Sequence, residues 1–583
     1  MAGAGAIVIG GRRGPRVRRA AVLTAVTLAI AIGVLMVGNF LFQRATAYDV
    51  PSGKRPALEL GSSESDRGLT LGQSRAARRF GLWVLHLTGD DYGLGWARGR
   101  LFARLGSSAE RRVRQAITPA PAGWLRSKLR RMSRRWSTRG LPSGLDPAFA
   151  RELAGLSRGL AEGGAGAASG EGGAPSFREL VYEQVAFDRG AQPLGPREAD
   201  PRAARRLSRS ALAFAGRGAA PEGHLWVGAS LRLGSPTEVL EPVVEFIRPE
   251  SESSMPHAVV TWPGQVGALA GMNQAGLVVV VVPARARFGA PGGEPIAALG
   301  RALLARASTL GEAQQLLRTR KGLAAASFLL ASGREGEAIV VERTPRRLAV
   351  RRADAGGGVW SAGHFTSPEF ESDGDNDRMR RYGVSGARHQ RLGELVAERR
   401  GVLDAQRALE VLRDRRAAGG AELPLGHPAA LLSTSARPIV FDASALIMWV
   451  GEGPGALGAL RAFDVRHELA GPGQATAGAA PPADLPADAA LDSAGYRDLV
   501  VAEAALADAV RMLAAGKRRL AVEALRRAVA FAPSLPGAHK LLADVLRAQR
   551  DSAGARAEYQ RFLELSPPYL DEVEEVRAWL GTP

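Results

Sequence analysis

The stretch "LSRSALAFAGRGAAPEGHLWVGASL", residues 207–231, decides how the middle of this chain folds. A small polar residue, Ser210, precedes an apolar run, a glycine-containing turn and a second apolar run. Two short apolar runs joined by such a turn predict a pair of β-strands. The chain contains no cysteine. A nucleophile at the start of this pair would therefore be the Ser210 hydroxyl and not a thiol.

Length and composition limit the class of protein. A chain of 583 residues, 46% of them apolar, is too long for one core and predicts several domains. The absence of cysteine excludes disulfides, thiolate metal sites and thiol catalysis. The net charge of +19 suggests a nucleic-acid or membrane partner. We expect no nucleic acid, because the chain lacks a nucleic-acid-binding signature. We predict no metal and no cofactor.

An apolar segment lies near the N-terminus. Residues 20–43 carry no charge and follow "RRGPRVRR" at 12–19. Such a segment is long enough to cross a hydrocarbon core of about 30 Å. Arginines on its N-terminal side place that end in the cytoplasm. We therefore predict a single-pass anchor in a bacterial cytoplasmic membrane, with most of the chain outside the cytoplasm. A signal peptide cleaved after "ATA" at 45–47 is the alternative.

The sequence divides into parts of different composition. We predict a basic segment (1–19), a transmembrane anchor (20–43), a tether (44–79), a main domain (80–469), a Pro/Ala linker (470–495) and helical repeats (496–583). In the last part Pro533 and Pro567 lie 34 residues apart, which is the tetratricopeptide period. Such repeats offer a groove to a partner protein. A helical bundle that only packs on the main domain is the alternative.

Several segments of the main domain carry a resemblance to a known family. These are "GDDYGLGWARGRL" (89–101), "ELAGLSRGLAEG" (152–163), "PGQVGALAGMNQAGL" (263–277) and "VFDASALIMWV" (440–450). In this order they resemble the autoproteolytic acyltransferase/hydrolase family typified by isopenicillin N acyltransferase, which belongs to the N-terminal-nucleophile hydrolases. The resemblance covers roughly residues 80–465. It implies an αββα sandwich of two antiparallel sheets with helices on both outer faces.

The predicted fold class is therefore α+β: this sandwich, preceded by one transmembrane helix and followed by an all-α helical repeat. The resemblance also implies a chemistry. Family enzymes cut their own chain before a cysteine, and the freed α-amine then acts as the base for that side chain. Backbone N–H groups and an asparagine stabilise the oxyanion. An amide or ester is hydrolysed, or an acyl group moves between amines, so the implied substrate is a small acylated amine.

The family's catalytic positions are changed in this chain. The cysteine position falls on Ser210 or Ala211. Ser230 stands in place of the asparagine of an Asn-x-Asp motif, and in "SAGHF" (361–365) Gly363 stands before His364 where the family has asparagine. The candidate catalytic residues are Ser210, Ser230, Gly363 and His364.

Asn273 is a candidate for substrate binding, because "GMNQAG" matches a turn of the family. Asparagine also forms turns without any catalytic part, and this alternative stays open. Two functions follow. The protein is an amidohydrolase or acyltransferase that uses Ser210 after self-cleavage, or it is an inactive family member that serves as a binding or scaffold protein. The resemblance favours the first function and the replaced polar positions favour the second.

Overall fold

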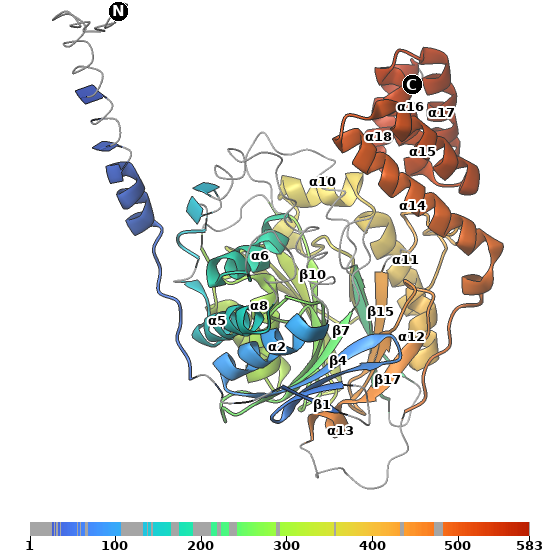
Figure 1. The fold of residues 1–583 in the computed structure, drawn as a ribbon. Coiled ribbons are helices and arrows are strands. Elements are labelled where there is room, and N and C mark those ends of the chain that lie inside the picture. Colours follow the sequence, from blue (N-terminus) through green and yellow to red (C-terminus); the bar gives the residue numbers. More distant parts are fainter. Residues whose placement is uncertain are drawn as a thin grey trace, which may run out of the picture.

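The structure is a computed structural model. It describes residues 26–27, 30, 33–34, 36–54, 56, 58, 60–63, 68–105, 132–133, 135–136, 138–141, 144–164, 174–190, 212–218, 223–232, 242–286, 292–354, 357–431, 436–470 and 482–581. We call the two sheets and the helices packed on them, within residues 60–469, the body (Figure 1).

The larger sheet of the body, sheet A, has eleven strands in the described part of the chain. In spatial order they are β1 (Leu60–Ser63), β2 (Gly68–Leu71), β3 (Ser74–Arg79), β4 (Leu82–Gly89), β7 (Val243–Pro249), β8 (His257–Thr261), β9 (Ala270–Asn273), β10 (Leu277–Pro283), β11 (Ala326–Ser332), β12 (Glu337–Arg343) and β13 (Leu348–Arg352). All neighbours are antiparallel except β4 and β7, which are parallel. A parallel pair needs a long crossover, and the chain between β4 and β7 supplies it.

The smaller sheet, sheet B, contains the strand pair predicted from residues 207–231. In spatial order its described strands are β14 (Val359–Ser361), β5 (Leu212–Arg217), β6 (Leu225–Arg232), β15 (Ala436–Asp442), β16 (Ile447–Gly451) and β17 (Leu460–Asp464). β5 and β6 pair antiparallel, with Ala213 opposite Ala229. The predicted hairpin is therefore present.

Strand alternation gives sheet B two buried faces. Ala213 and Ala229 belong to the apolar core that sheet B shares with sheet A. Phe214 and Trp226 pack in a second core with helices α11 (Ser385–Glu398) and α12 (Ala405–Leu412). Successive strand residues point to opposite faces, so this division follows from the sequence alternation.

The described helices of the body are α2 (Asp91–Leu105), α5 (Pro147–Glu162), α6 (Phe177–Gly190), α8 (Ile296–Arg306), α9 (Leu310–Thr319), η2 (Pro368–Phe370), α10 (Gly374–Tyr382), α11 (Ser385–Glu398), α12 (Ala405–Leu412) and α13 (Val465–Leu469).

Helices α2, α5 and α8 lie together on the side of sheet A away from sheet B (Figure 1). α2 and α5 approach so closely that their glycines touch the other helix's backbone. A Cβ built on Gly95 would lie 1.8 Å from the carbonyl oxygen of Glu152, and one on Gly155 would lie 2.1 Å from that of Tyr92. Only glycine leaves room for this contact.

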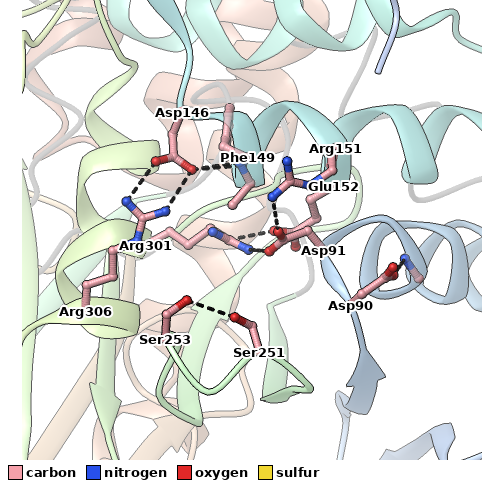
Figure 2. A network of polar contacts seen from close by, with 12 residues as sticks. Asp90, Asp91, Asp146, Phe149, Arg151, Glu152, Ser251, Ser253, Arg301 and Arg306 are labelled. Carbon is pink, nitrogen blue, oxygen red and sulfur yellow. Dashed lines mark hydrogen bonds and ion pairs between the residues drawn. The ribbon is translucent and has the colours of Figure 1, made fainter. Parts of the chain in front are cut away.

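A buried network of charges joins these helices to sheet A. Arg98 of α2 donates to both oxygens of Glu245 on β7, each at 2.8 Å, and to Glu152 of α5 at 2.5 Å. Figure 2 shows the neighbouring part, where Arg301 of α8 pairs with Glu152 (2.6 Å) and Asp91 (3.2 Å). Each buried charge here has an opposite partner, as the cost of desolvation requires.

The C-terminal region is helical, as predicted. It contains η3 (Ala489–Asp492), α14 (Ala494–Ala514), α15 (Arg518–Phe531), α16 (Pro536–Ala548), α17 (Ser552–Glu564) and α18 (Leu570–Leu580). Residues 34 positions apart hold equivalent places, since Ala521 and Ala555 are both fully buried, and so are Leu525 and Tyr559. The assignment to tetratricopeptide repeats, the domain boundaries and the partner protein stay predictions.

The predicted fold class is wrong in two respects. None of the described helices combines the length and hydropathy that a membrane span requires. The body is also mixed α/β, with the parallel β4–β7 pair inside sheet A. The predicted membrane anchor, and the localisation derived from it, are therefore not supported.

One buried carboxyl makes the stability of the body depend on pH. Asp188 of α6 accepts a hydrogen bond from the N–H of Ile296 (2.9 Å), and burial raises its pKa to about 8. The native state therefore keeps a proton that the unfolded chain releases above about pH 4, so between pH 4 and 8 stability falls as the pH rises.

Asp188→Asn cannot ionise and should remove this loss. We expect its melting temperature to match that of the wild type near pH 4 and to exceed it increasingly up to pH 8. The underlying difference in the free energy of unfolding should grow by up to about 1.4 kcal/mol per pH unit. Thermal unfolding at pH 5 and pH 8 measures the difference. Asp404→Asn, at the exposed N-cap of α12, controls for the change to an amide. A constant difference at both pH values would contradict the argument.

Candidate functional site

The predicted nucleophile is not placed by the structure. Ser210 and Ala211 lie outside the described residues, and the described part of β5 begins at Leu212. The candidate site is therefore described from residues that lie next to β5.

Ser230 is fully buried on β6, directly opposite Leu212. By strand alternation it lies on the face of Trp226, which packs against the outer helices. Its hydroxyl has no hydrogen-bond partner among the described residues. Ser230 therefore does not face the space between the two sheets.

Gly363 and His364 follow the end of β14. Gly363 has a φ of +98°, which favours glycine. A Cβ built on it would lie 3.6 Å from the carbonyl oxygen of Pro283. Because glycine has no side chain, this position offers a ligand only backbone groups.

The His364 side chain is buried, and its ring centroid lies 5.1 Å from that of His389 on α11. Burial lowers the pKa of His364 to about 4, against the opposing charge of Glu342. Its imidazole is therefore neutral at pH 7. The Nδ1 atom has no hydrogen-bond partner in the described part of the chain.

The segment after His364 is fixed by buried polar contacts. Glu342 of β12 accepts hydrogen bonds from the N–H groups of Thr366 (3.0 Å) and Ser367 (2.9 Å) and from Nε of Arg351 (2.8 Å). Asn376 of α10 binds both backbone groups of Phe365, at 2.7 and 3.0 Å. These contacts fix the backbone directly after His364.

Two serines that the sequence analysis missed face the space between the sheets near this segment. Ser361 lies opposite Ala213 of β5 and so shares the inner face of sheet B. Ser327 of β11 lies opposite Val282 of β10. Val281, the residue before Val282, points to the other face of the sheet, toward Gly300 of α8. Ser327 therefore lies on the inner face of sheet A.

Both hydroxyls are buried and without a hydrogen-bond partner among the residues described. Buried hydroxyls in proteins are nearly always paired. Ser327 pairs across the sheet with Glu342, which holds the segment that follows His364. We therefore take Ser327, Ser361 and His364 as candidate polar groups for a ligand. An isolated serine within an apolar strand gives no signal in the sequence, so Ser327 and Ser361 could not be predicted from it.

Asn273 has a different environment. Its Nδ2 donates to the carbonyl oxygens of Leu304 (3.0 Å) and Ala307 (2.7 Å), and its Oδ1 accepts from the N–H groups of Ala275 (3.1 Å) and Leu277 (3.0 Å). These contacts tie the β9–β10 turn to the end of α8. They fit the turn-forming alternative, because the side chain has no group left for a substrate.

A family model matches the central part of the chain. Residues 245–418 match the family model of acyl-coenzyme A:6-aminopenicillanic acid acyl-transferase. This match includes β7 to β14 and helices α8 to α12, and thus Ser327, Ser361 and His364. No curated protein matches the sequence.

Solved structures with similarity to the chain include an acid amidase orthologue, a hydrolase and an acylase. An N-acylethanolamine-hydrolyzing acid amidase orthologue from Caenorhabditis elegans is 15% identical (TM-score 0.28), covering 40% of this chain and 93% of its own. A mutant conjugated bile acid hydrolase from Clostridium perfringens is 12% identical (TM-score 0.30), covering 44% and 92%. A penicillin V acylase from Agrobacterium tumefaciens is 14% identical (TM-score 0.26), covering 45% and 81%.

The resemblance predicted from the sequence is confirmed by the family model, although the tetratricopeptide assignment is not. The central part of this chain is similar to the acyl-coenzyme A:6-aminopenicillanic acid acyl-transferase family.

Proposed function

We propose that the protein hydrolyses the amide bond of a small acylated amine, or transfers its acyl group, with Ser210 as the nucleophile. The observation that carries this proposal is the group of buried, unpaired polar atoms of Ser327, Ser361 and His364. They lie beside β5 within the region that matches the acyl-transferase family. Buried polar atoms without a protein partner are groups that a bound ligand can satisfy.

The proposed chemistry has two stages. First the Ser210 hydroxyl attacks the carbonyl carbon of Arg209, and water hydrolyses the resulting ester, which leaves a free α-amine on Ser210. The hydroxyl then attacks the substrate amide and its proton passes to the α-amine. The α-amine returns this proton to the departing amine, and water or a second amine takes the acyl group. Neutral donors at the site stabilise the oxyanion.

Self-cleavage gives a direct test. We expect the purified chain to contain a fragment whose N-terminus is Ser210, read by N-terminal sequencing and intact mass. Ser210→Ala should remain uncut and lose at least about 10³-fold in turnover of an acylated amine, because no nucleophile remains. Ser208→Ala, two residues away, is the matched control and should cut normally. An uncut wild-type chain, with the same turnover in both variants, would exclude the proposal.

A binding function is the second candidate. Gly363 and the outward-facing Ser230 favour it, because neither position supplies the polar side chain that the family mechanism uses. In that case the wild type binds an acylated amine without cleaving it and without cutting its own chain.

A further inference from the structure

Arg285 lies beside the candidate site, in the segment that follows β10. Its neighbours Ala284 and Ala286 pack in one apolar cluster with Phe365, the residue after His364. The carbonyl oxygen of Pro283 also lies next to Gly363. The first turn of α10 borders both residues, since Asn376 binds Phe365 and the charge of Asp375 acts on Arg285.

The Arg285 guanidinium has no hydrogen bond or ion pair with any residue that the structure describes. Only 8% of the residue is exposed, and its Nε atom is fully buried without a partner. The negative charge of Asp375 and the positive charge of Arg378 act on it with opposite effect, and these two residues pair with each other at 3.7 Å. No carboxylate in the described part of the chain therefore contacts the Arg285 guanidinium.

Every other buried arginine in the described part of the chain has partners. Their acceptors are Glu245 and Glu152 for Arg98, Glu152 and Asp91 for Arg301, Leu317 and Arg320 for Arg343, Pro428 for Arg388, Asp414 and Glu394 for Arg391, and Gly455 for Arg437. A buried charge without a partner costs several kcal/mol. Arg285 is the exception, and it is the buried arginine that follows the strand bordering Gly363.

We propose that Arg285 binds a carboxylate on the amine half of the acylated substrate. The planar guanidinium matches a carboxylate with two parallel hydrogen bonds. A single unpaired cation fits a monoanion, whereas a phosphate dianion needs a second cation, and Arg378 is already paired with Asp375. The substrate class is then an N-acyl amino acid. This inference rests on the proposed function, because it takes an acylated amine as the substrate of the site.

The test compares two probes that differ only in charge, N-octanoylglycine and N-octanoylglycinamide. Calorimetric titration of the full-length protein at pH 7 measures both affinities. We expect the wild type to bind the acid at least 10-fold more tightly, a preference of about 1.4 kcal/mol. Arg285→Gln should bind both probes equally, and Arg285→Lys should keep part of the preference. Arg352→Gln, at an exposed ion pair with Glu337, is the control and should keep all of it.

Thermal unfolding separates a binding role from a structural one. Because Arg285→Gln removes an unpaired buried charge, its melting temperature should equal or exceed that of the wild type. A lower melting temperature, equal wild-type affinities, no binding of either probe, or an unchanged preference in Arg285→Gln would each overturn the inference. Binding with the expected preference but without cleavage of N-octanoylglycine would support the inference and contradict only the proposed hydrolysis.

Discussion

Replacing Gly155 with alanine is expected to lower the free energy of unfolding of the body by about 3 kcal/mol, the upper range for an overpacked core. The added Cβ would lie 2.1 Å from the carbonyl oxygen of Tyr92 and 2.8 Å from the backbone nitrogen of Trp96. Both contacts are with backbone, so no side chain can rotate away. α2 and α5 would have to separate, and the core beneath them would lose its close packing.

A matched glycine controls for helix propensity. Gly537 lies within α16, and a Cβ built there meets nothing within 4 Å. Gly537→Ala should therefore be neutral or stabilising by up to about 1 kcal/mol. Denaturant unfolding of the full-length protein, followed by circular dichroism, measures both variants. Similar midpoints for Gly155→Ala and the wild type would mean that the two helices are not packed backbone to backbone.

Replacing Arg98 with methionine is expected to cost about 3–5 kcal/mol, the range measured when one partner of a buried ion pair is removed. Methionine fills most of the volume but leaves Glu245 buried without a cation. Burial raises the pKa of Glu245, and the charge of Arg98 opposes this rise. Without Arg98 the pKa rises further, so the native state retains a proton that the unfolded state loses. The cost should therefore be larger at pH 8 than at pH 5.

Two further variants test whether the loss of stability comes from an unpaired buried charge. The double variant Arg98→Met/Glu245→Gln should recover part of the lost stability, because the uncompensated charge is gone. Arg519→Met removes the exposed ion pair of Arg519 with Glu523 (3.6 Å) on α15 and should change stability by less than about 1 kcal/mol. Urea midpoints at pH 5 and pH 8 measure all three variants. A pH-independent loss in Arg98→Met would indicate a packing defect and not an unpaired charge.

Local patterns in the sequence predicted the local structure well. The two apolar runs around residue 221 form the β5–β6 hairpin, and the 34-residue spacing places Ala521 and Ala555 at equivalent buried positions. Asn273 forms the turn that its sequence context allows. These features depend on residues close together in the chain, so their physics is contained in short segments.

The membrane anchor predicted from the apolar segment at 20–43 is not supported, because none of the helices that the structure describes meets the length and hydropathy requirements of a membrane span. The parallel pairing of β4 with β7 was also missed, because the two strands are separated by more than 150 residues of sequence.

The sequence by itself determined the β5–β6 strand pair, the helical character of the C-terminal region, the resemblance to the acyl-transferase family and the loss of that family's polar side chains at Ser230 and Gly363. Only the tertiary structure decided which isolated polar residues meet. Ser327 and Ser361 face each other's sheet because of strand alternation and sheet stacking. The unpaired charge of Arg285 depends on burial against distant residues. Burial and pairing are properties of contacts between segments, and no single segment of sequence encodes them.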